Sequence, residues 1–300
     1  MRIAVIGEGV IDRFLLPNSE SDVIGGSGLN TAIAAKLAGL DTYWLSLHSN
    51  DRFGQDILDY ASKAGVLPES PMRSTFATPL VEIRLRADGS PSYEFHMKNA
   101  ADWQWTDSDL KKLSEYDIFH LTSLSAVLRP GSEAIFKYLQ TRPASQIISY
   151  DPNARPSAIS SEEQNFVKQR IEEIVQIVNI VKVSDEDLRW LSSDDIYETA
   201  LRWSTLGPVF VIMTSGENGA TLFANGEKIS DIPGVSIDVL DTVGAGDTLM
   251  GWILRCISMS GGLPTSEQLI DGLQIAVKAA AITCSRQGCR PPTESEVLER

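Results

Sequence analysis

The sequence contains few cysteines, few histidines and a small share of positive charge. Its 300 residues include three cysteines, three histidines and 26 lysines and arginines against 40 acidic residues, which gives a net charge of −14. The cysteines at positions 256, 284 and 289 match neither a disulfide framework nor a metal-ligand spacing, so we expect free thiols in a reducing, cytoplasmic setting. The acidic balance argues against nucleic acid or an anionic membrane as partner, because both require a basic surface.

Long hydrophobic runs and a complete dinucleotide fingerprint are also absent. No apolar segment reaches the roughly 18 residues needed to cross a bilayer. The first ten residues are short and carry Glu8, so we expect a first strand there and not a signal peptide. Gly7 and Gly9 follow this strand, but the third glycine and the immediate helix of a dinucleotide-binding motif are missing. This argues against a nicotinamide-dependent oxidoreductase.

What the sequence does contain is a regular alternation of strand-like and helix-like segments. Short apolar runs such as residues 180–183 alternate with amphipathic stretches such as 162–178 along the whole chain. We find no internal repeat, low-complexity tract or linker. The pattern predicts one α/β domain over residues 1–300, built on a doubly wound, mostly parallel sheet flanked by helices.

The most informative stretch is the glycine-rich segment 241–247, with the sequence DTVGAGD. We expect it to join a strand at residues 235–240 to a long apolar helix. Glycine leaves backbone N–H groups accessible, and the first turn of a helix has unpaired N–H groups and partial positive charge. The turn formed by Gly244, Ala245 and Gly246 is therefore predicted to be an anion hole suited to phosphate.

Asp247 follows this turn directly. A carboxylate gains nothing by facing a phosphate, but it can take a proton from a hydroxyl that is about to attack. An anion hole and a base on one turn indicate phosphoryl transfer to an alcohol. Alternatively, the glycines form only a tight turn, and Asp247 complements the helix dipole as a solvated acid.

Several polar side chains follow predicted strands, at the edge where open α/β sheets bind ligands. Asp12 comes after the first strand, where a solvated loop acid is the alternative. A glycine-rich turn at 25–28, which includes Gly26, allows the backbone to approach a small polar ligand. Asn30 then enters an alanine-rich helix and offers a donor and an acceptor together, or it is an ordinary helix residue.

A third strand ends in the sequence DPNAR at residues 151–155. Asp151 and Asn153 can hydrogen-bond a sugar or the surroundings of a phosphate. Arg155 offers a fork-shaped cation that suits phosphate oxygens. The same sequence is equally typical of a simple turn.

Two further turns follow strands in the second half of the chain. Residues 184–187 read SDED, and their acids could organise Mg²⁺ through water or serve as first-turn residues of a helix. The polar turn from Thr214 to Gly219 is placed to border nucleotide phosphates. The long helix expected at residues 266–286 could wall an adenine site or could simply pack.

Residues 74–97 differ from the rest of the chain. Apolar and charged residues alternate over 79–86, a turn follows at 87–90, and a second run returns over 92–96. The alternation predicts a hairpin with one solvated face beside the buried parallel sheet. Such a flap can close over a site and exclude water, or it is an ordinary edge hairpin.

Two motifs together closely resemble the signatures of the ribokinase-like (PfkB) sugar kinases. The first is GGSGLN at residues 25–30, and the second is DTVGAGDT at residues 241–248. The resemblance covers essentially the whole chain and is greatest to bacterial fructokinases. The stretches that carry this second similarity are residues 7–12, 93–95, 101–102, 148–155 and 182–186.

The resemblance implies an ATP- and Mg²⁺-dependent homodimeric enzyme that transfers the γ-phosphoryl group to a hydroxyl of a small sugar, with fructose as the expected acceptor. It implies a β lid from about residues 12–24 and 74–98. The residue roles implied are Asp247 as base, residues 244–246 as anion hole, and Asp12, Gly26 and Asn30 as sugar ligands, with Lys182, Ser184, Thr214, Gly216 and Gly219 near the nucleotide. Backbone oxygens near Asp241, Val243 and Gly288 would hold a monovalent cation such as K⁺.

Departures from the family pattern leave the substrates open. His96 and Met97 stand where many fructokinases have Tyr-Arg, so we place His96 in the sugar pocket as a determinant of specificity. Val277 replaces the usual asparagine near adenine, and Asp187 lies in the region where ribokinases carry an Asn-x-x-Glu motif for Mg²⁺. The alternatives are another sugar, a sugar acid such as 2-keto-3-deoxygluconate, or a nucleoside as acceptor. A regulator that binds sugar or nucleotide without catalysis is a further alternative.

Overall fold

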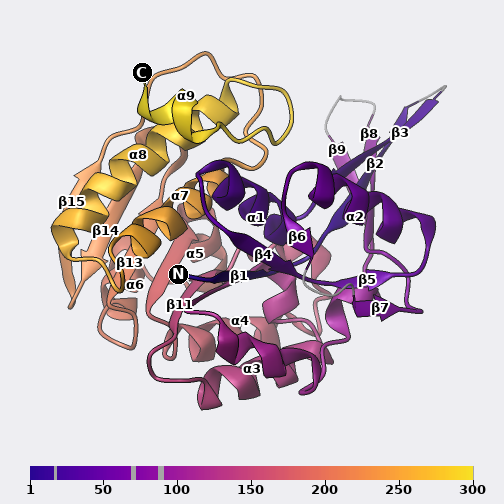
Figure 1. Cartoon of the computed structure of the whole chain (residues 1–300), viewed down its shortest axis with the longest axis horizontal. Coiled ribbons are helices and arrows are strands. Elements are labelled where there is room, and N and C mark those ends of the chain that lie inside the picture. Colours follow the sequence, from indigo (N-terminus) through magenta and orange to yellow (C-terminus); the bar gives the residue numbers. More distant parts are fainter. Residues whose placement is uncertain (17–18, 69–71, 87–90, 300) are drawn as a thin grey trace.

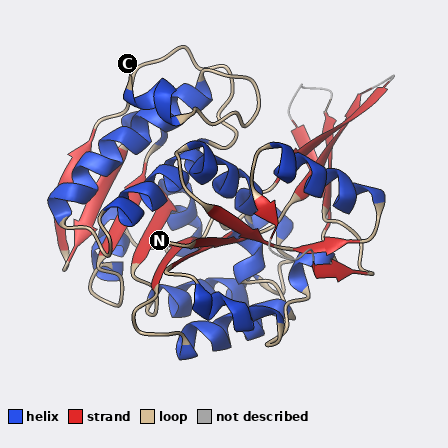
Figure 2. Ribbon diagram, in the orientation of Figure 1, coloured by secondary structure: helices blue, strands red, loops and turns tan. Residues whose placement is uncertain are grey.

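The computed structural model describes residues 1–16, 19–68, 72–86 and 91–299. In this part of the chain, nine strands form a central sheet with helices on both faces, and a smaller sheet projects from one side (Figures 1 and 2). The strands of the central sheet are β1 (Ile3–Ile6), β4 (Thr42–Leu45), β6 (Leu67–Pro68), β10 (Ile118–Thr122), β11 (Ile147–Asp151), β12 (Ile180–Ser184), β13 (Phe210–Thr214), β14 (Ala220–Ala224) and β15 (Glu227–Ile232). Their order is β15-β14-β13-β12-β11-β10-β1-β4-β6.

Parallel pairing runs through this sheet from β6 to β13, whereas β13–β14 and β14–β15 are antiparallel. Every side chain of β1 is buried, as expected for a parallel strand covered on both faces. The predicted doubly wound, mostly parallel sheet is confirmed. Its carboxyl-terminal edge brings together the turns that follow β1, β10, β11 and β12.

Helices cover both faces of the sheet, and the two faces carry separate hydrophobic clusters. One face carries α1 (Ser27–Leu37), α7 (Ala245–Met259) and α8 (Ser266–Cys284). The other face carries α3 (Gly131–Thr141), α4 (Gln164–Val175), α5 (Asp185–Leu191) and α6 (Ile196–Trp203). Two further helices, α2 (Arg52–Lys63) and α9 (Glu294–Leu298), are peripheral (Figure 1). Short 3-10 helices lie at Ala101–Trp103, Asp109–Glu115, Ser123–Ala126, Pro156–Ala158 and Gly216–Asn218. Of the described helices, none is both long and apolar enough to cross a membrane.

Small residues let α1 approach both β1 and α7. A Cβ atom on Gly28 would lie 2.3 Å from the carbonyl carbon of Gly7, so the first turn of α1 sits directly on the end of β1. A Cβ atom on Gly251 would lie 2.7 Å from the Cβ of Ala34. These contacts are closer than larger side chains permit, and they bring the N-termini of α1 and α7 together.

The projecting sheet has the order β3-β2-β8-β9, from β2 (Val10–Leu16), β3 (Ser19–Gly25), β8 (Leu80–Leu85) and β9 (Pro91–His96). The β2–β3 and β8–β9 pairs are antiparallel, and β2 pairs with β8 in parallel. The predicted hairpin strands are confirmed, while the predicted turn at 87–90 lies outside the described residues. Strands β5 (Leu47–Ser49) and β7 (Met72–Ser74) form a separate pair nearby.

The strand predicted at residues 235–240 is wrong. The segment is irregular, and its apolar side chains are exposed, with 71% of Leu240 accessible. Instead of pairing with a strand, the N–H groups of Leu240 and Asp241 donate to the carbonyl of Cys284 at the end of α8. Residues such as valine and isoleucine favour strands only where a pleated, half-buried surface is available. This segment instead pairs with the C-terminus of α8, and that tertiary contact overrides the preference of its residues for a strand.

Candidate active site

The glycine turn before α7 has the geometry expected of an anion hole. Gly244 adopts a left-handed conformation with φ of 76°, and no side chain caps the helix that begins at Ala245. A Cβ atom on Gly244 would lie 2.1 Å from the Sγ of Cys289, so both the conformation and the contact require glycine here. The uncapped first turn leaves N–H groups for an anion.

Asp247 is buried at this turn, with 8% of its surface exposed, and both of its carboxylate oxygens accept hydrogen bonds from α1. Ser27 Oγ donates to Oδ1 at 2.7 Å, and Asn30 Nδ2 donates to Oδ2 at 2.9 Å. The two motifs that are far apart in the sequence therefore meet at one carboxylate. In this structure the donor capacity of Asn30 is directed to Asp247. Ser27 was not among the residues predicted from the sequence.

Lys182 supplies a buried positive charge beneath the glycine turn. Its Nζ atom lies 2.9 Å from Asp151 Oδ2 and 2.8 Å from the position that a Cβ atom on Gly246 would occupy. Burial opposes the charged form of Lys182, but the neighbouring carboxylates of Asp151, Asp187 and Asp247 raise its pKa. A glycine at position 246 is thus needed to bring the backbone close to this ammonium group.

Asp12 and Arg155 face the same region from β2 and from the turn after β11. Burial raises the pKa of Asp12 to about 6, and the positive charge of Arg155 opposes this rise. Arg155 is exposed and has a φ of 48°, in the left-handed region that arginine rarely adopts. Its guanidinium group is therefore accessible to solvent and close enough to Asp12 for its charge to act on that carboxyl group.

Two buried acids near this crevice were missed as site residues by the sequence analysis. Glu8 follows β1 and accepts a hydrogen bond from Ser125 Oγ at 3.3 Å, and Asp102 accepts one from Ser46 Oγ. Burial raises the pKa of both carboxyl groups. The position of Glu8 just after a buried strand is a sequence signal that could have identified it. No sequence spacing places Asp102 beside Glu8.

The prediction that His96 lines the sugar pocket is not supported by this chain's geometry. Asp12 is in register with Val81, and Val81 with Phe95, so these three side chains share one face of the projecting sheet. His96 is the next residue and points to the opposite face, where its Nε2 atom lies 3.8 Å from Glu94 and 3.9 Å from Glu82. The strand was identified correctly, but neighbouring strand residues alternate between faces.

Of the residues predicted to surround the nucleotide, some lie at an open turn and others are buried in packing contacts. Thr214 ends β13, and the left-handed Gly216 has open space around it. A Cβ atom on Gly219 would lie 2.1 Å from the carbonyl oxygen of Ile232, so that glycine is required by the packing of its own turn. Val277 is 6% exposed within the hydrophobic cluster and does not form an accessible wall.

The acidic turn after β12 adopts the helix-start arrangement. Ser184 caps α5 in a reciprocal capping box with Asp187, whose Oδ2 accepts from Ser184 Oγ at 2.7 Å. Asp187 Oδ1 accepts from the backbone N–H of Ala154 at 3.0 Å and so ties this turn to the one after β11. The prediction of first-turn residues is confirmed, and a role for Asp187 towards Mg²⁺ stays a prediction.

The three residues expected around a monovalent cation lie together. Asp241 Oδ1 accepts from the N–H of Val243 at 3.0 Å, and Asp241 Oδ2 accepts from the N–H of Gly288 at 2.9 Å. The carboxylate thus joins the glycine-rich turn to the loop after α8. Cation binding at this junction stays a prediction.

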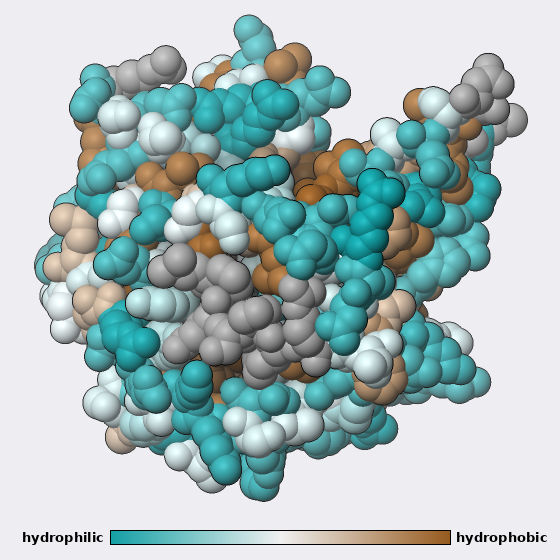
Figure 3. Space-filling model, turned by 45° about the vertical axis from the view of Figure 1, so that its right-hand side comes forward, coloured by the Kyte–Doolittle hydropathy of each residue, from teal (hydrophilic) through white to brown (hydrophobic). Residues whose placement is uncertain are grey.

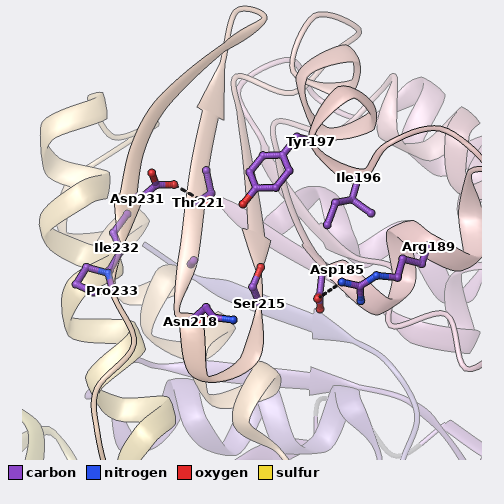
Figure 4. Close-up of a pocket in the computed structure, with 11 residues that line it drawn as sticks. Asp185, Arg189, Ile196, Tyr197, Ser215, Asn218, Thr221, Asp231, Ile232 and Pro233 are labelled. Carbon is purple, nitrogen blue, oxygen red and sulfur yellow. Dashed lines mark hydrogen bonds and ion pairs between the residues drawn. The ribbon is translucent and has the colours of Figure 1, made fainter.

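A cavity of about 690 Å³ lies outside this crevice, between α5, α6 and the β14–β15 hairpin (Figure 4). Asp185, Arg189, Tyr197 and Asp231 line it, together with residues of the Ser215–Asn218 turn. It includes no residue of the glycine turn before α7 and none of Asp12, Asn30 and Asp247. The residues predicted to bind or deprotonate the sugar therefore lie outside this cavity, whereas Ser215 and Asn218 of the predicted nucleotide turn line it.

Comparison with known proteins establishes the family of the chain. Residues 3–296 match the model of the pfkB family carbohydrate kinases. The chain belongs to this family. It is therefore a carbohydrate kinase, a phosphotransferase that acts on a hydroxyl group.

Individual relatives are similar over nearly their whole length. A fructokinase of Rhizobium leguminosarum bv. trifolii is 30% identical over 86% of this chain and 80% of the relative. A fructokinase of Vibrio alginolyticus is 26% identical over 99% of this chain and 98% of the relative. The crystal structure of a Xylella fastidiosa fructokinase has a TM-score of 0.89 at 24% identity, covering 99% of this chain and 97% of that one, and confirms the fold.

Replacing Asp12 by asparagine tests the electrostatic description of the crevice. Because the pKa of Asp12 is raised to about 6, the folded state holds a proton between about pH 4 and pH 6 that the unfolded state has lost. Stability due to this group therefore falls as the pH rises through that window, and the cost persists above it. We expect Asp12→Asn to raise the unfolding free energy at pH 7 by about 1–3 kcal/mol, with little change near pH 4.

Urea unfolding at both pH values measures this difference. Asp59→Asn on the exposed surface of α2 is the control and should change stability equally little at both. Equal effects of Asp12→Asn on the unfolding free energy at pH 4 and pH 7 would contradict a raised pKa for the carboxyl group of Asp12.

Proposed function

We propose that this protein transfers the γ-phosphoryl group of ATP to a hydroxyl of a small neutral sugar, with fructose as the acceptor. The observation that carries the proposal is the buried carboxylate of Asp247, held by α1 at the uncapped N-terminus of α7. The names of relatives support the substrates. They include fructokinases from bacteria and plants, a Xylella fastidiosa structure with bound ATP and a Vibrio cholerae structure with fructose and ADP.

The proposed reaction is a direct transfer between two oxygens. A sugar hydroxyl within reach of Asp247 gives its proton to the carboxylate as its oxygen attacks the γ-phosphorus. A new phosphorus–oxygen bond forms, the bond to the β-phosphate oxygen breaks, and ADP leaves with the electron pair. Asp247 holds the proton until the product departs.

Charge on the transferring group is stabilised by groups already in place. In the proposed complex the N–H groups of Gly244 and Gly246 bind the phosphate, and Lys182, which lies against Gly246, adds a positive charge. Arg155, whose charge acts on Asp12, adds a second positive charge near the sugar. These local devices let an acidic protein hold a polyanionic substrate.

Asp187 is the residue that we propose to hold Mg²⁺ through water. Oδ2 accepts two hydrogen bonds from Ser184, whereas Oδ1 accepts one from Ala154 and keeps a further lone pair, which fits water-mediated contact better than direct coordination. The ion would neutralise part of the phosphate charge. We also propose K⁺ binding by carbonyl groups around Asp241, Val243 and Gly288, and a cytoplasmic location, which the free thiols of the three cysteines favour.

A second copy of the chain is the partner that we propose for the projecting sheet, which would also act as the lid. Phe14, Val23 and Tyr93 lie on the face that bears Asp12 and are 38%, 47% and 52% exposed. Hydrophobic side chains gather in the hollow between this sheet and the body (Figure 3). An exposed apolar face of this kind is typical of a protein interface. Self-association would cover the face in both copies at once.

Assaying ADP release with ketoses, aldoses, sugar acids and nucleosides tests the substrate assignment. We expect the highest kcat/KM with fructose, because relatives of this chain from bacteria and plants are named fructokinases. Greater activity with a sugar acid or a nucleoside would overturn fructose but not the kinase. Ligand binding without ADP release from any acceptor would indicate a regulator. Repeating the assay with EDTA, and with K⁺ replaced by tetramethylammonium, tests the two cations.

Asp247→Asn tests the base. The amide has nearly the same shape but cannot take the proton, so we expect kcat to fall by about 10² or more while both KM values change little. Asp238→Asn, an exposed neighbour in the sequence, is the control and should leave kcat unchanged. Turnover near that of the wild type in Asp247→Asn would refute the assignment.

Phe14→Ser tests self-association. We expect it to shift the protein from dimer to monomer in size-exclusion chromatography with light scattering, since it removes an apolar contact from the proposed interface. Leu206→Ser replaces a side chain of similar exposure, 41%, on another surface and should leave the dimer intact. A monomeric wild type at micromolar concentration would contradict the proposal.

A further inference from the structure

A short chain of buried hydroxyl groups leads from the sheet to Asp247. Thr122 Oγ1, at the end of β10, lies 2.9 Å from Ser27 Oγ, which lies 2.7 Å from Asp247 Oδ1. Thr122, Ser27 and Asp247 are 0%, 6% and 8% exposed. These hydrogen bonds join three segments that are distant in the sequence. The reaction described above assigns no role to Ser27 or Thr122.

The direction of these hydrogen bonds follows from the chemistry of the groups. An ionised carboxylate only accepts, so the single hydroxyl proton of Ser27 is directed to Asp247 Oδ1. Ser27 Oγ can then only accept from Thr122, which makes Thr122 the donor. Each hydroxyl group is thereby fixed in one orientation, and each bond polarises the next.

The two oxygens of Asp247 are held in different ways. Oδ1 is bound by a hydroxyl that is itself bound to the rigid end of a central strand. Oδ2 is bound by the amide of Asn30, which the family resemblance places among the sugar ligands. When a sugar takes up the donor of Asn30, Oδ2 becomes the free acceptor while Oδ1 keeps its partner.

We propose that Ser27 and Thr122 are positioning residues that hold Oδ1 of Asp247, so that Oδ2 faces the sugar hydroxyl and takes its proton. The proposal rests on Asp247 being the base. A carboxylate at the end of a rotatable side chain must be fixed to within a fraction of an ångström for efficient proton transfer. Packing alone does not fix the rotation of its two oxygens, whereas a directional hydrogen bond does.

Nearby packing makes clean substitutions available. A Cβ atom on Gly7 would lie 2.6 Å from Thr122 Cγ2, so the methyl group of Thr122 packs against that glycine. Thr122→Val keeps this methyl contact and removes only the hydroxyl, and Thr122→Ser keeps the hydroxyl. Ser132→Ala is the matched control, because Ser132 is also a fully buried serine near a helix start and its Oγ has no hydrogen-bond partner among the described residues.

Steady-state kinetics of these variants test the proposal. We expect Ser27→Ala to lower kcat about 10-fold to 100-fold, with KM for sugar and for ATP within twofold of wild type, because a hydrogen bond to a charged group that must be oriented is lost. Thr122→Val should lower kcat about threefold to tenfold. Thr122→Ser, which keeps the hydroxyl group, and the control Ser132→Ala should both have the kcat of the wild type.

The double variant Ser27→Ala with Asp247→Asn separates this inference from the assignment of the base. If Ser27 acts only through Asp247, removing it from the Asp247→Asn protein costs no further turnover. An inactive Asp247→Asn protein together with an unimpaired Ser27→Ala protein would overturn the inference and leave the base in place. Additive losses in the double variant, or equal losses in KM and kcat for Ser27→Ala, would also overturn it. An active Asp247→Asn protein would remove the base assignment itself.

Discussion

The close approach of α1 to α7 is the constraint on which the site depends. Hydrogen bonds of 2.7 and 2.9 Å from Ser27 and Asn30 to Asp247 require the two helix starts to meet almost in contact. Gly28 against Gly7, and Gly251 against Ala34, leave no room for additional atoms at the contacts that set this distance. The glycines of the first motif therefore serve the packing of α1 as much as any ligand, and the position of the base follows from that packing.

Electrostatics at the site depend on burial more than on net charge. A chain with a net charge of −14 has no general attraction for ATP, so positive potential must be produced locally. Lys182 does this from beneath Gly246, where exclusion of water makes its field strong. Its partner Asp151 keeps the buried charge paired, and an unpaired lysine at this position would lower the stability of the folded state. The pair is thus a condition for placing a cation under the anion hole.

Much of the fold and part of the site could be predicted from the sequence, because strand and helix periodicity are local properties. Asp247 and Asn30 could be expected together across more than 200 residues because the two motifs that contain them match the signatures of one kinase family, although neither residue follows a strand of the central sheet. The strand expected at 235–240 failed because nothing in a local pattern reveals whether a pairing edge is available. The sequence could not show that His96 lies on the face opposite to Asp12, because the face of a strand in the projecting sheet depends on its register with β8 and β2.

The residues that the sequence analysis missed are recognised by their hydrogen bonds in the structure. Glu8, Asp102, Ser27 and Thr122 each form a buried side-chain hydrogen bond that no local sequence pattern predicts. Buried carboxyl groups with raised pKa values cost stability, so a crevice that gathers them is not arranged for folding. Each of Glu8 and Asp102 has one hydroxyl partner within the protein, and we expect a sugar with several hydroxyl groups to add further hydrogen bonds to such carboxyl groups. This would offset part of the cost of burying them.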